Sequence, residues 1–261
     1  MAKSSSSRTG IVKAYKHGWP RLAVHQMIVG SVRKQFFAIR AQGLEQLRNA
    51  LNTDPSGLIF AANHSCWWDV FLAHTLNELI PVDGYGMMEH FNLRRFRFFQ
   101  RIGAYSVDRD NPASLRESLN YTLELLSRPR AGVWMFPQGL IAPNEARPLK
   151  FQPGLRALLT AGDRLRIVPV ALKFEFWQEQ KPEVFVRFGE PCWVHRSQRA
   201  SLLEEWERRV TVELDLLKAD VEAQDPSRFE MLMRGPTSMN DRYARLRATF
   251  AGKTPGAPDA F

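Results

Sequence analysis

The sequence lacks several features that would indicate common classes of protein. It has only two cysteines, Cys66 and Cys192, which give neither a disulfide framework nor a metal-binding spacing and so fit a reducing compartment. No run of about 18 uncharged apolar residues occurs, so we predict neither a transmembrane helix nor a signal peptide. A P-loop, a G-x-S-x-G elbow and an H-E-x-x-H motif are also missing, which disfavours ATP-dependent, serine-hydrolase and zinc chemistry.

Acidic residues are absent from the first 44 positions, and the first of them is Glu45. Eight basic residues in this block account for nearly all of the net charge of +9: Lys3, Arg8, Lys13, Lys16, Arg21, Arg33, Lys34 and Arg40. Such a block favours an anionic partner, either nucleic acid or lipid head groups.

Residues 10–34 mix these charges with Trp19 and aliphatic side chains at a loosely helical spacing that Pro20 interrupts. This pattern predicts two short amphipathic helices in a membrane interface. The alternative is a helical pair packed on the core of the protein.

Short apolar runs alternate with helical patterns between residues 58 and 172, which is typical of an α/β layer structure. We expect strands near 36–39, 59–62, 105–107, 133–136, 167–172 and 184–188. Helices are expected from Ser65, near 91–101, near 112–126 and near 154–160. A long helix is expected from Ser201, whose spacing to Glu204 matches a capping box. Its apolar stripe consists of Leu202, Leu203, Trp206, Val210, Leu214, Leu217 and Val221. The predicted organisation is a disordered segment 1–9, interface helices 10–35, an α/β domain 36–224 and a partly flexible tail 225–261.

The apolar run ending at Ala62 is followed by Asn63, His64 and, five residues after the histidine, Asp69. If Ser65 opens a helix, the carboxylate lies about one turn on and can reach back to the imidazole. A histidine with a carboxylate on one ring nitrogen is suited to act as a general base. The alternative for His64 is a buried structural histidine. A second alternative for the mechanism is that Cys66 acts as a nucleophile.

Two other strand ends carry candidate ligand-binding residues. Arg109 follows the strand at 105–107, where it could hold a phosphate or carboxylate; the alternative is a surface ion pair with Asp108 or Asp110. The strand at 133–136 ends in Phe136, Pro137, Gln138 and Gly139.

In their order, these strand ends resemble the glycerolipid acyltransferases, which include glycerol-3-phosphate and lysophosphatidate acyltransferases. The family block N-H-x-x-x-x-D is similar to Asn63 to Asp69, and G-x-x-x-x-x-R is similar to Gly103 to Arg109. The block F-P-E-G-T-R-S is matched in part by residues 136–142, and V-P-V by residues 168–170. The resemblance covers roughly residues 36–190.

The resemblance implies a mixed, largely parallel sheet flanked by helices, and transfer of an acyl group from acyl-CoA or acyl-carrier protein to a lipid hydroxyl. His64 would be the base and Asp69 its partner. Arg109 and residues 136–139 would bind substrate, with backbone N–H groups near Gly139 as candidate oxyanion donors. It implies no cofactor and no metal. The expected location is the cytoplasmic face of the cell membrane, as a peripheral protein bound through residues 10–35.

The third block departs from the family pattern. Gln138 stands in place of glutamate, and Leu140, Ile141 and Ala142 stand in place of Thr-Arg-Ser. The acceptor pocket therefore loses a carboxylate and a cation, so an acceptor other than a simple glycerol phosphate is expected, such as another lysolipid or a glycosylated isoprenoid.

Two other function classes remain as alternatives. One is a non-catalytic relative of the family at a membrane. The other is a nucleic-acid-binding protein, suggested by the pI near 9.9 and by the interleaved Arg and Phe of residues 91–101. No recognised nucleic-acid motif accompanies that segment, so no nucleic-acid partner is predicted.

Overall fold

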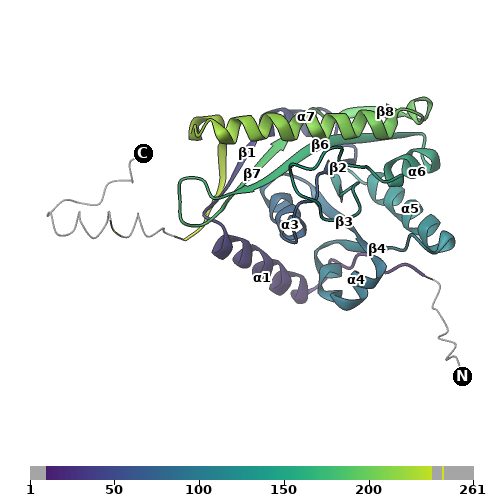
Figure 1. Ribbon diagram of the computed structural model, residues 1–261. Coiled ribbons are helices and arrows are strands. Elements are labelled where there is room, and N and C mark those ends of the chain that lie inside the picture. Colours follow the sequence, from purple (N-terminus) through teal and green to yellow (C-terminus); the bar gives the residue numbers. More distant parts are fainter. Residues whose placement is uncertain (1–9, 237–242, 244–261) are drawn as a thin grey trace, which may run out of the picture.

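The computed structural model describes residues 10–236 and Tyr243. A single sheet lies between two layers of helices, with α7 along one side and α1 and α4 on the other (Figure 1). The strands are β1 (Ala38–Gln42), β2 (Leu58–Ala62), β3 (Asp83–Glu89), β4 (Ala104–Val107), β5 (Ala131–Met135), β6 (Arg164–Glu175), β7 (Glu183–Phe188), β8 (Cys192–His195) and β9 (Glu230–Arg234). The main helices are α1 (Trp19–Gln35), α2 (Leu44–Thr53), α3 (Asp69–Leu79), α4 (His90–Arg95), α5 (Pro112–Leu126), α6 (Gly154–Ala161) and α7 (Leu202–Glu222).

The strands follow the spatial order β4-β3-β5-β2-β6-β7-β1-β9, and β8 pairs with β6. β2 to β6 are mutually parallel, because a helical crossover joins each one to the next. β7 and β8 run antiparallel to β6, and β9 runs antiparallel to β1. The prediction of a mixed, largely parallel sheet flanked by helices is therefore confirmed.

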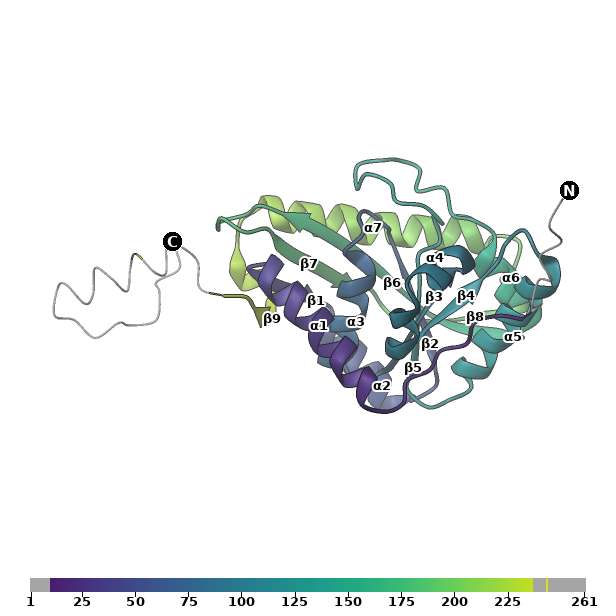
Figure 2. The same ribbon diagram turned by 90° about the horizontal axis from the view of Figure 1, so that it is seen from below.

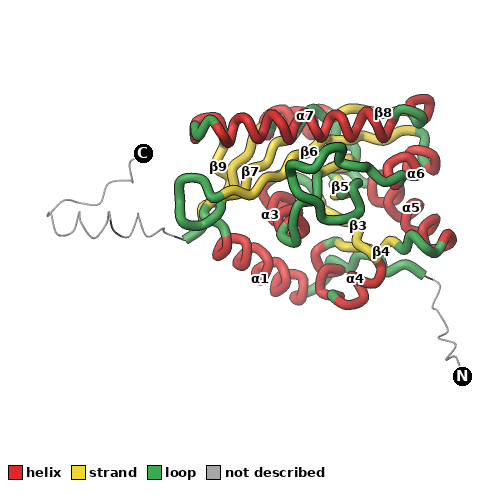
Figure 3. The backbone as a smooth tube through the Cα atoms, viewed as in Figure 1, coloured by secondary structure: helices red, strands yellow, loops and turns green. Residues whose placement is uncertain are grey.

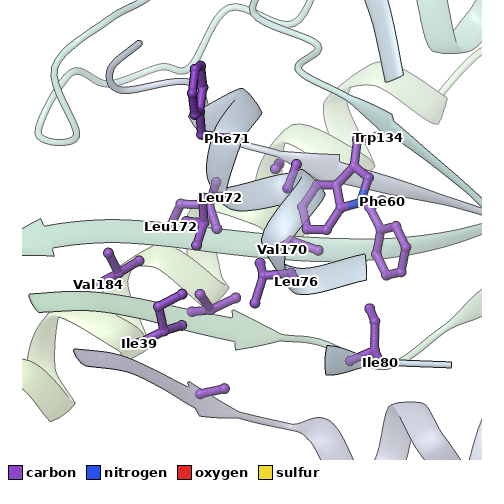
Figure 4. Close-up of a cluster of buried hydrophobic side chains, with 14 of the residues drawn as sticks. Ile39, Phe60, Phe71, Leu72, Leu76, Ile80, Trp134, Val170, Leu172 and Val184 are labelled. Carbon is purple, nitrogen blue, oxygen red and sulfur yellow. The ribbon is translucent and has the colours of Figure 1, made fainter. Parts of the chain in front are cut away.

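Side chains of β2 alternate between two cores, because successive residues of a strand point to opposite faces. Phe60 faces α2 and α3 and stacks on Trp134 at 4.6 Å between ring centroids, whereas Ile59 faces α5, α6 and α7. Figure 4 shows the first core, where Leu76 and Ile80 from the α3 side lie with Phe60 and Trp134. All five residues of β2 are buried, as expected for an interior strand of a parallel sheet.

Two helix starts differ from the sequence prediction. Ser65 does not cap a helix; α3 begins at Asp69, after a turn in which the Asp69 carboxylate accepts hydrogen bonds from backbone N–H groups. Ser201 caps α7 only by position, since its hydroxyl donates to the Gln198 carbonyl. The apolar stripe predicted for α7 is confirmed, with residues including Trp206 and Val210 buried against the sheet.

The prediction of two helices in residues 10–34 is wrong, because only α1 forms there. The preceding segment is drawn as loop in Figure 3 and lies against β4: the Val12 N–H donates to the Ser106 hydroxyl, and the Ser106 N–H donates to the Val12 carbonyl, each at 2.8 Å. Backbone groups used in this way cannot form a helix. α1 starts beside Gly18, at φ 74°, and Pro20 occupies its first turn.

α1 buries Ile28 and Val32 and crosses this face of the molecule beside α3 (Figure 2). Its opposite side leaves Trp19, Leu22 and Met27 exposed. The side of α1 that carries Ile28 and Val32 therefore packs on the core of the protein, as the alternative to a membrane-interface helix predicted.

The segment 91–101 forms two short helices, α4 and η1 (Arg97–Ile102), in place of one amphipathic helix. Phe99 is buried, and Phe96 and Phe98 pack against the same core. These rings are therefore unavailable as a platform for stacking bases. Only Phe91 is strongly exposed, so the support for nucleic-acid binding is weaker than the sequence alone indicates.

Some boundaries also differ. The first strand begins at Ala38, two residues later than the predicted start, and β3, β8 and β9 were not predicted. β9 pairs with β1, so the sheet extends beyond the predicted boundary at 224. The predicted disorder of residues 1–9 and the flexible Gly/Pro-rich end of the tail lie outside the described residues.

Candidate functional site

The predicted site residues meet at one edge of the sheet, where the parallel strands end. His64 follows β2, Arg109 follows β4, and Phe136 follows β5. β2, β5, β3 and β4 are consecutive neighbours in the sheet. The ends of the three strands that carry site residues, β2, β5 and β4, therefore lie along one short stretch of this edge. The carboxyl edge of a parallel sheet is the usual position of a ligand site in α/β proteins.

His64 and Asp69 form a close pair. The His64 Nδ1 atom lies 2.7 Å from Asp69 Oδ2. The same carboxylate oxygen accepts hydrogen bonds from the Ser65 N–H at 2.7 Å and the Cys66 N–H at 3.0 Å. Asp69 has no exposed surface. Three donors converging on one buried oxygen fix the carboxylate beneath the imidazole.

The pairing sets the proton on the imidazole. Nδ1 must carry the hydrogen, because its partner is an acceptor, and this leaves Nε2 with a free lone pair. Nε2 makes no hydrogen bond within residues 10–236, and the side chain remains 18% exposed. The ring stacks on Phe136 at a centroid distance of 4.6 Å. His64 is therefore held with a basic nitrogen accessible from outside the protein.

Gln138 holds the backbone of His64 in place. Its side-chain oxygen accepts a hydrogen bond of 2.7 Å from the His64 N–H, and the residue is buried. A glutamate at this position would offer the same acceptor, so the departure from the family block keeps the contact. On the other side, the His64 carbonyl accepts from the Ala142 N–H at 2.9 Å.

Arg109 lies over the turn formed by residues 136–139. Gly139 has φ 69°, and a Cβ atom there would lie 2.9 Å from Arg109 Nη1. The guanidinium pairs with Glu89, at the end of β3, at 3.2 Å. The alternative pairing with Asp108 or Asp110 is not formed.

The turn also bears on the predicted oxyanion donors. The Gly139 N–H donates to the Phe136 carbonyl at 3.0 Å, and the Pro137 carbonyl accepts from the Gln152 N–H at 2.7 Å. The Gly139 N–H is thus occupied within the turn in this conformation.

Cys66 is a poor candidate nucleophile. Burial, followed by the negative charge of Asp69, raises the pKa of its thiol to about 12. A thiol with this pKa is protonated at neutral pH, whereas the thiolate is the reactive form. The structure therefore disfavours the alternative in which Cys66 attacks the substrate.

The comparison with known families agrees with this geometry. Residues 38–173, a little over half of the 261, match the family model described as Acyltransferase. The chain belongs to the acyltransferase family. This acyltransferase thereby falls in the glycerolipid acyltransferase superfamily, as the resemblance of the four blocks predicted. The match runs from the start of β1 into β6 and includes all the predicted site residues. No curated protein matches the chain in sequence.

Sequence reasoning missed two residues that shape the site of this acyltransferase. Glu89 was missed because β3, which delivers it, was not predicted. Asn63 was recognised only as the first residue of the N-H-x-x-x-x-D block, and no role was predicted for its side chain. It is buried, and its side chain exchanges two hydrogen bonds with the backbone of Leu172 while also donating to Asn144 Oδ1 at 2.8 Å. Asn63 thereby fastens the end of β2 to β6 directly before His64.

Exposed apolar side chains occur in the two chain segments that contact the pair. Trp67 is 53% exposed, and Leu140 and Ile141 are exposed on the loop that hydrogen-bonds to His64 through Ala142. Exposed apolar side chains in these segments suit a substrate that carries hydrocarbon.

Proposed function

We propose that this acyltransferase moves a fatty acyl group from a thioester, acyl-CoA or acyl-carrier protein, to a hydroxyl of a lipid acceptor, with His64 as general base. The observation that carries the proposal is the 2.7 Å contact between His64 Nδ1 and the buried Asp69 carboxylate, which leaves Nε2 as the basic atom.

The reaction needs no group beyond the two substrates and these side chains. Nε2 of His64 takes the proton of the acceptor hydroxyl as its oxygen attacks the thioester carbonyl carbon. Asp69 stabilises the imidazolium that forms. The tetrahedral intermediate then expels the thiolate, which takes the proton back from Nε2, so that the products are an ester and a free thiol.

The proposed acceptor is a lipid other than a simple glycerol phosphate. Arg109 is already paired with Glu89, and Ile141 stands where the family block has arginine. Both features reduce the positive charge available to a phosphate monoester. Another lysolipid or a glycosylated isoprenoid fits this site better. Acylation of lysophosphatidate in preference to uncharged acceptors would contradict this part of the proposal.

The proposed location is the cytoplasmic face of the membrane, with residues 10–35 on an anionic lipid surface. α1 exposes Trp19 and Leu22 and carries Arg33 and Lys34 in its last turn. Such a helix can rest in a bilayer interface. Within residues 10–236, no helix combines the length and the apolar character needed to cross a membrane.

Sedimentation with anionic vesicles tests this location. A variant with Trp19→Ser and Leu22→Ser should lose vesicle binding, whereas Leu216→Ser, which changes an exposed leucine on α7, should keep it. Equal binding by both variants would contradict a role for α1.

The enzymatic proposal is tested by thiol release from palmitoyl-CoA, and separately from palmitoyl-acyl-carrier protein, with a panel of lipid acceptors. Release by the wild type should depend on an acceptor and fall by ~100-fold or more in His64→Ala. His17→Ala is the matched control, since His17 is exposed and lies outside the site. Release that is indifferent to His64→Ala would overturn the base assignment. No release with either donor would favour a non-catalytic relative, and salt-sensitive binding to oligonucleotides would then favour the nucleic-acid alternative.

A further inference from the structure

A second group of polar residues lies away from the acyl-transfer site, between α1 and α3. It consists of His25 on α1, and His74 and Glu78 on α3. His74 and Glu78 are four residues apart, so they share one face of their helix. His74 is buried, whereas His25 and Glu78 have side-chain exposures of 20% and 40%, so the group opens to solvent on one side.

The ligating atoms of the three side chains converge. His25 Nδ1 lies 3.2 Å from His74 Nε2 and 3.8 Å from Glu78 Oε1, and all three atoms lie within 4.8 Å of one another. Zinc bonds of 2.0–2.1 Å at tetrahedral angles place ligand atoms about 3.3 Å apart. The histidine pair has this spacing, and the half-exposed carboxylate needs to move only slightly to reach it.

The charges around the group are balanced. Two basic side chains, Lys16 and Arg21, lie near His74. Lys16 is paired with Asp83. Arg21 opposes a cation here, and the Glu78 carboxylate offsets it.

We propose that His25, His74 and Glu78 bind one zinc-class divalent cation that joins α1 to α3. Two imidazole nitrogens and one carboxylate oxygen favour zinc over magnesium or calcium, which prefer oxygen ligands. A water molecule would complete the tetrahedron. The metal would hold α1, with its exposed Trp19 and Leu22, against the helix whose first residue is Asp69. Its role is structural, and the acyl-transfer step does not use it.

The experiment uses the full chain without a polyhistidine tag, treated with a chelator and then titrated with zinc by calorimetry. The wild type should bind one zinc per chain, and magnesium should not bind. Thermal stability gives an independent readout: at a hundredfold excess of free zinc over Kd, Tm should rise by about 5–10 °C.

Three variants identify the ligands. His25→Gln and Glu78→Gln change partly exposed side chains, so both should fold, and each should weaken zinc binding by ~100-fold or more and abolish the rise in Tm. His17→Gln is the matched control and should bind as the wild type does. His64→Ala should also bind normally, which separates this site from the acyl-transfer pair.

Hydrogen exchange then tests the link between the helices. Zinc should slow amide exchange in residues 19–35 of the wild type and leave exchange in His25→Gln unchanged. The proposal is overturned if the wild type takes up no zinc, or if His25→Gln binds zinc as tightly as the wild type. Either result would make the cluster a hydrogen-bonded histidine pair beside a surface carboxylate.

Discussion

The substitution Asp69→Asn separates the charge of the carboxylate from its hydrogen bonds. All three donors, from His64, Ser65 and Cys66, converge on the single oxygen Oδ2. An asparagine side chain therefore has one favourable orientation, with its carbonyl oxygen in this position and its NH2 group turned away. In that orientation Nδ1 of His64 keeps its proton and Nε2 remains the base, so only the negative charge is lost.

The size of the effect follows from that charge. The imidazolium formed in the reaction and the carboxylate have charge centres about 4 Å apart, and their attraction is about 4 kcal/mol at an effective dielectric constant of about 20. Because 1.36 kcal/mol corresponds to a tenfold change in rate, kcat should fall by roughly 10³-fold. Asp69→Ala is a less informative variant, since it leaves two backbone N–H groups without an acceptor, at ~1–3 kcal/mol each, and threatens the fold.

The assay is single-turnover thiol release at saturating acceptor, with Tm and circular dichroism to show that Asp69→Asn is folded. A folded variant with kcat within tenfold of the wild type would refute the role of the charge. A loss of roughly 10⁴-fold or more would indicate instead that the asparagine adopts the other orientation and reverses the tautomer.

Three further predictions concern the surroundings of the pair. Gln138→Ala leaves the His64 N–H without its acceptor, so it should lower the unfolding free energy by ~1–3 kcal/mol and reduce kcat. Gln138→Glu keeps the acceptor and should retain more activity; equal losses of kcat in the two variants would contradict this role of Gln138. Gly139→Ala places a Cβ atom 2.9 Å from Arg109 Nη1 on a backbone with φ 69°, so it should lower the unfolding free energy by ~1–2 kcal/mol. Because the new methyl group displaces Arg109, steady-state kinetics should show a larger rise in KM for the acceptor than fall in kcat. Cys66→Ser should leave kcat nearly unchanged. Burial raises the pKa of this thiol to about 12 in the folded protein, so the unfolded chain loses the proton first as the pH rises above 9. The unfolding free energy of the wild type should therefore fall between pH 9 and 12 more steeply than that of Cys66→Ser, as urea titrations at several pH values would measure.

Local sequence patterns were enough to predict most of the elements on which the site depends. β2 was predicted from an apolar run in the interior of a parallel sheet, and α7 from a stripe of apolar residues at helical spacing. α5 begins where Asn111 and Pro112 indicate, and the Asn111 side chain caps it. The pairing of His64 with Asp69 was predicted for a similar reason, because five residues of chain keep the two side chains close.

Patterns failed where distant contacts decide the local structure. β3 contains two glycines and polar residues and has no strong alternation, yet it forms because β4 and β5 flank it on both sides. Residues 10–17 have helical spacing but run extended along β4 and η1, since Ser106 and Gln100 take up their backbone hydrogen bonds.

By itself, the sequence determined the α/β class, the family and the residues that carry the likeness, because burial periodicity and short motifs are local properties of the chain. The tertiary structure alone decided that Glu89 pairs with Arg109, that Gln138 holds the His64 backbone, and that His25 faces His74 across two helices. The members of each such pair are separated by at least 20 residues, and only strand order and helix packing determine which of them meet.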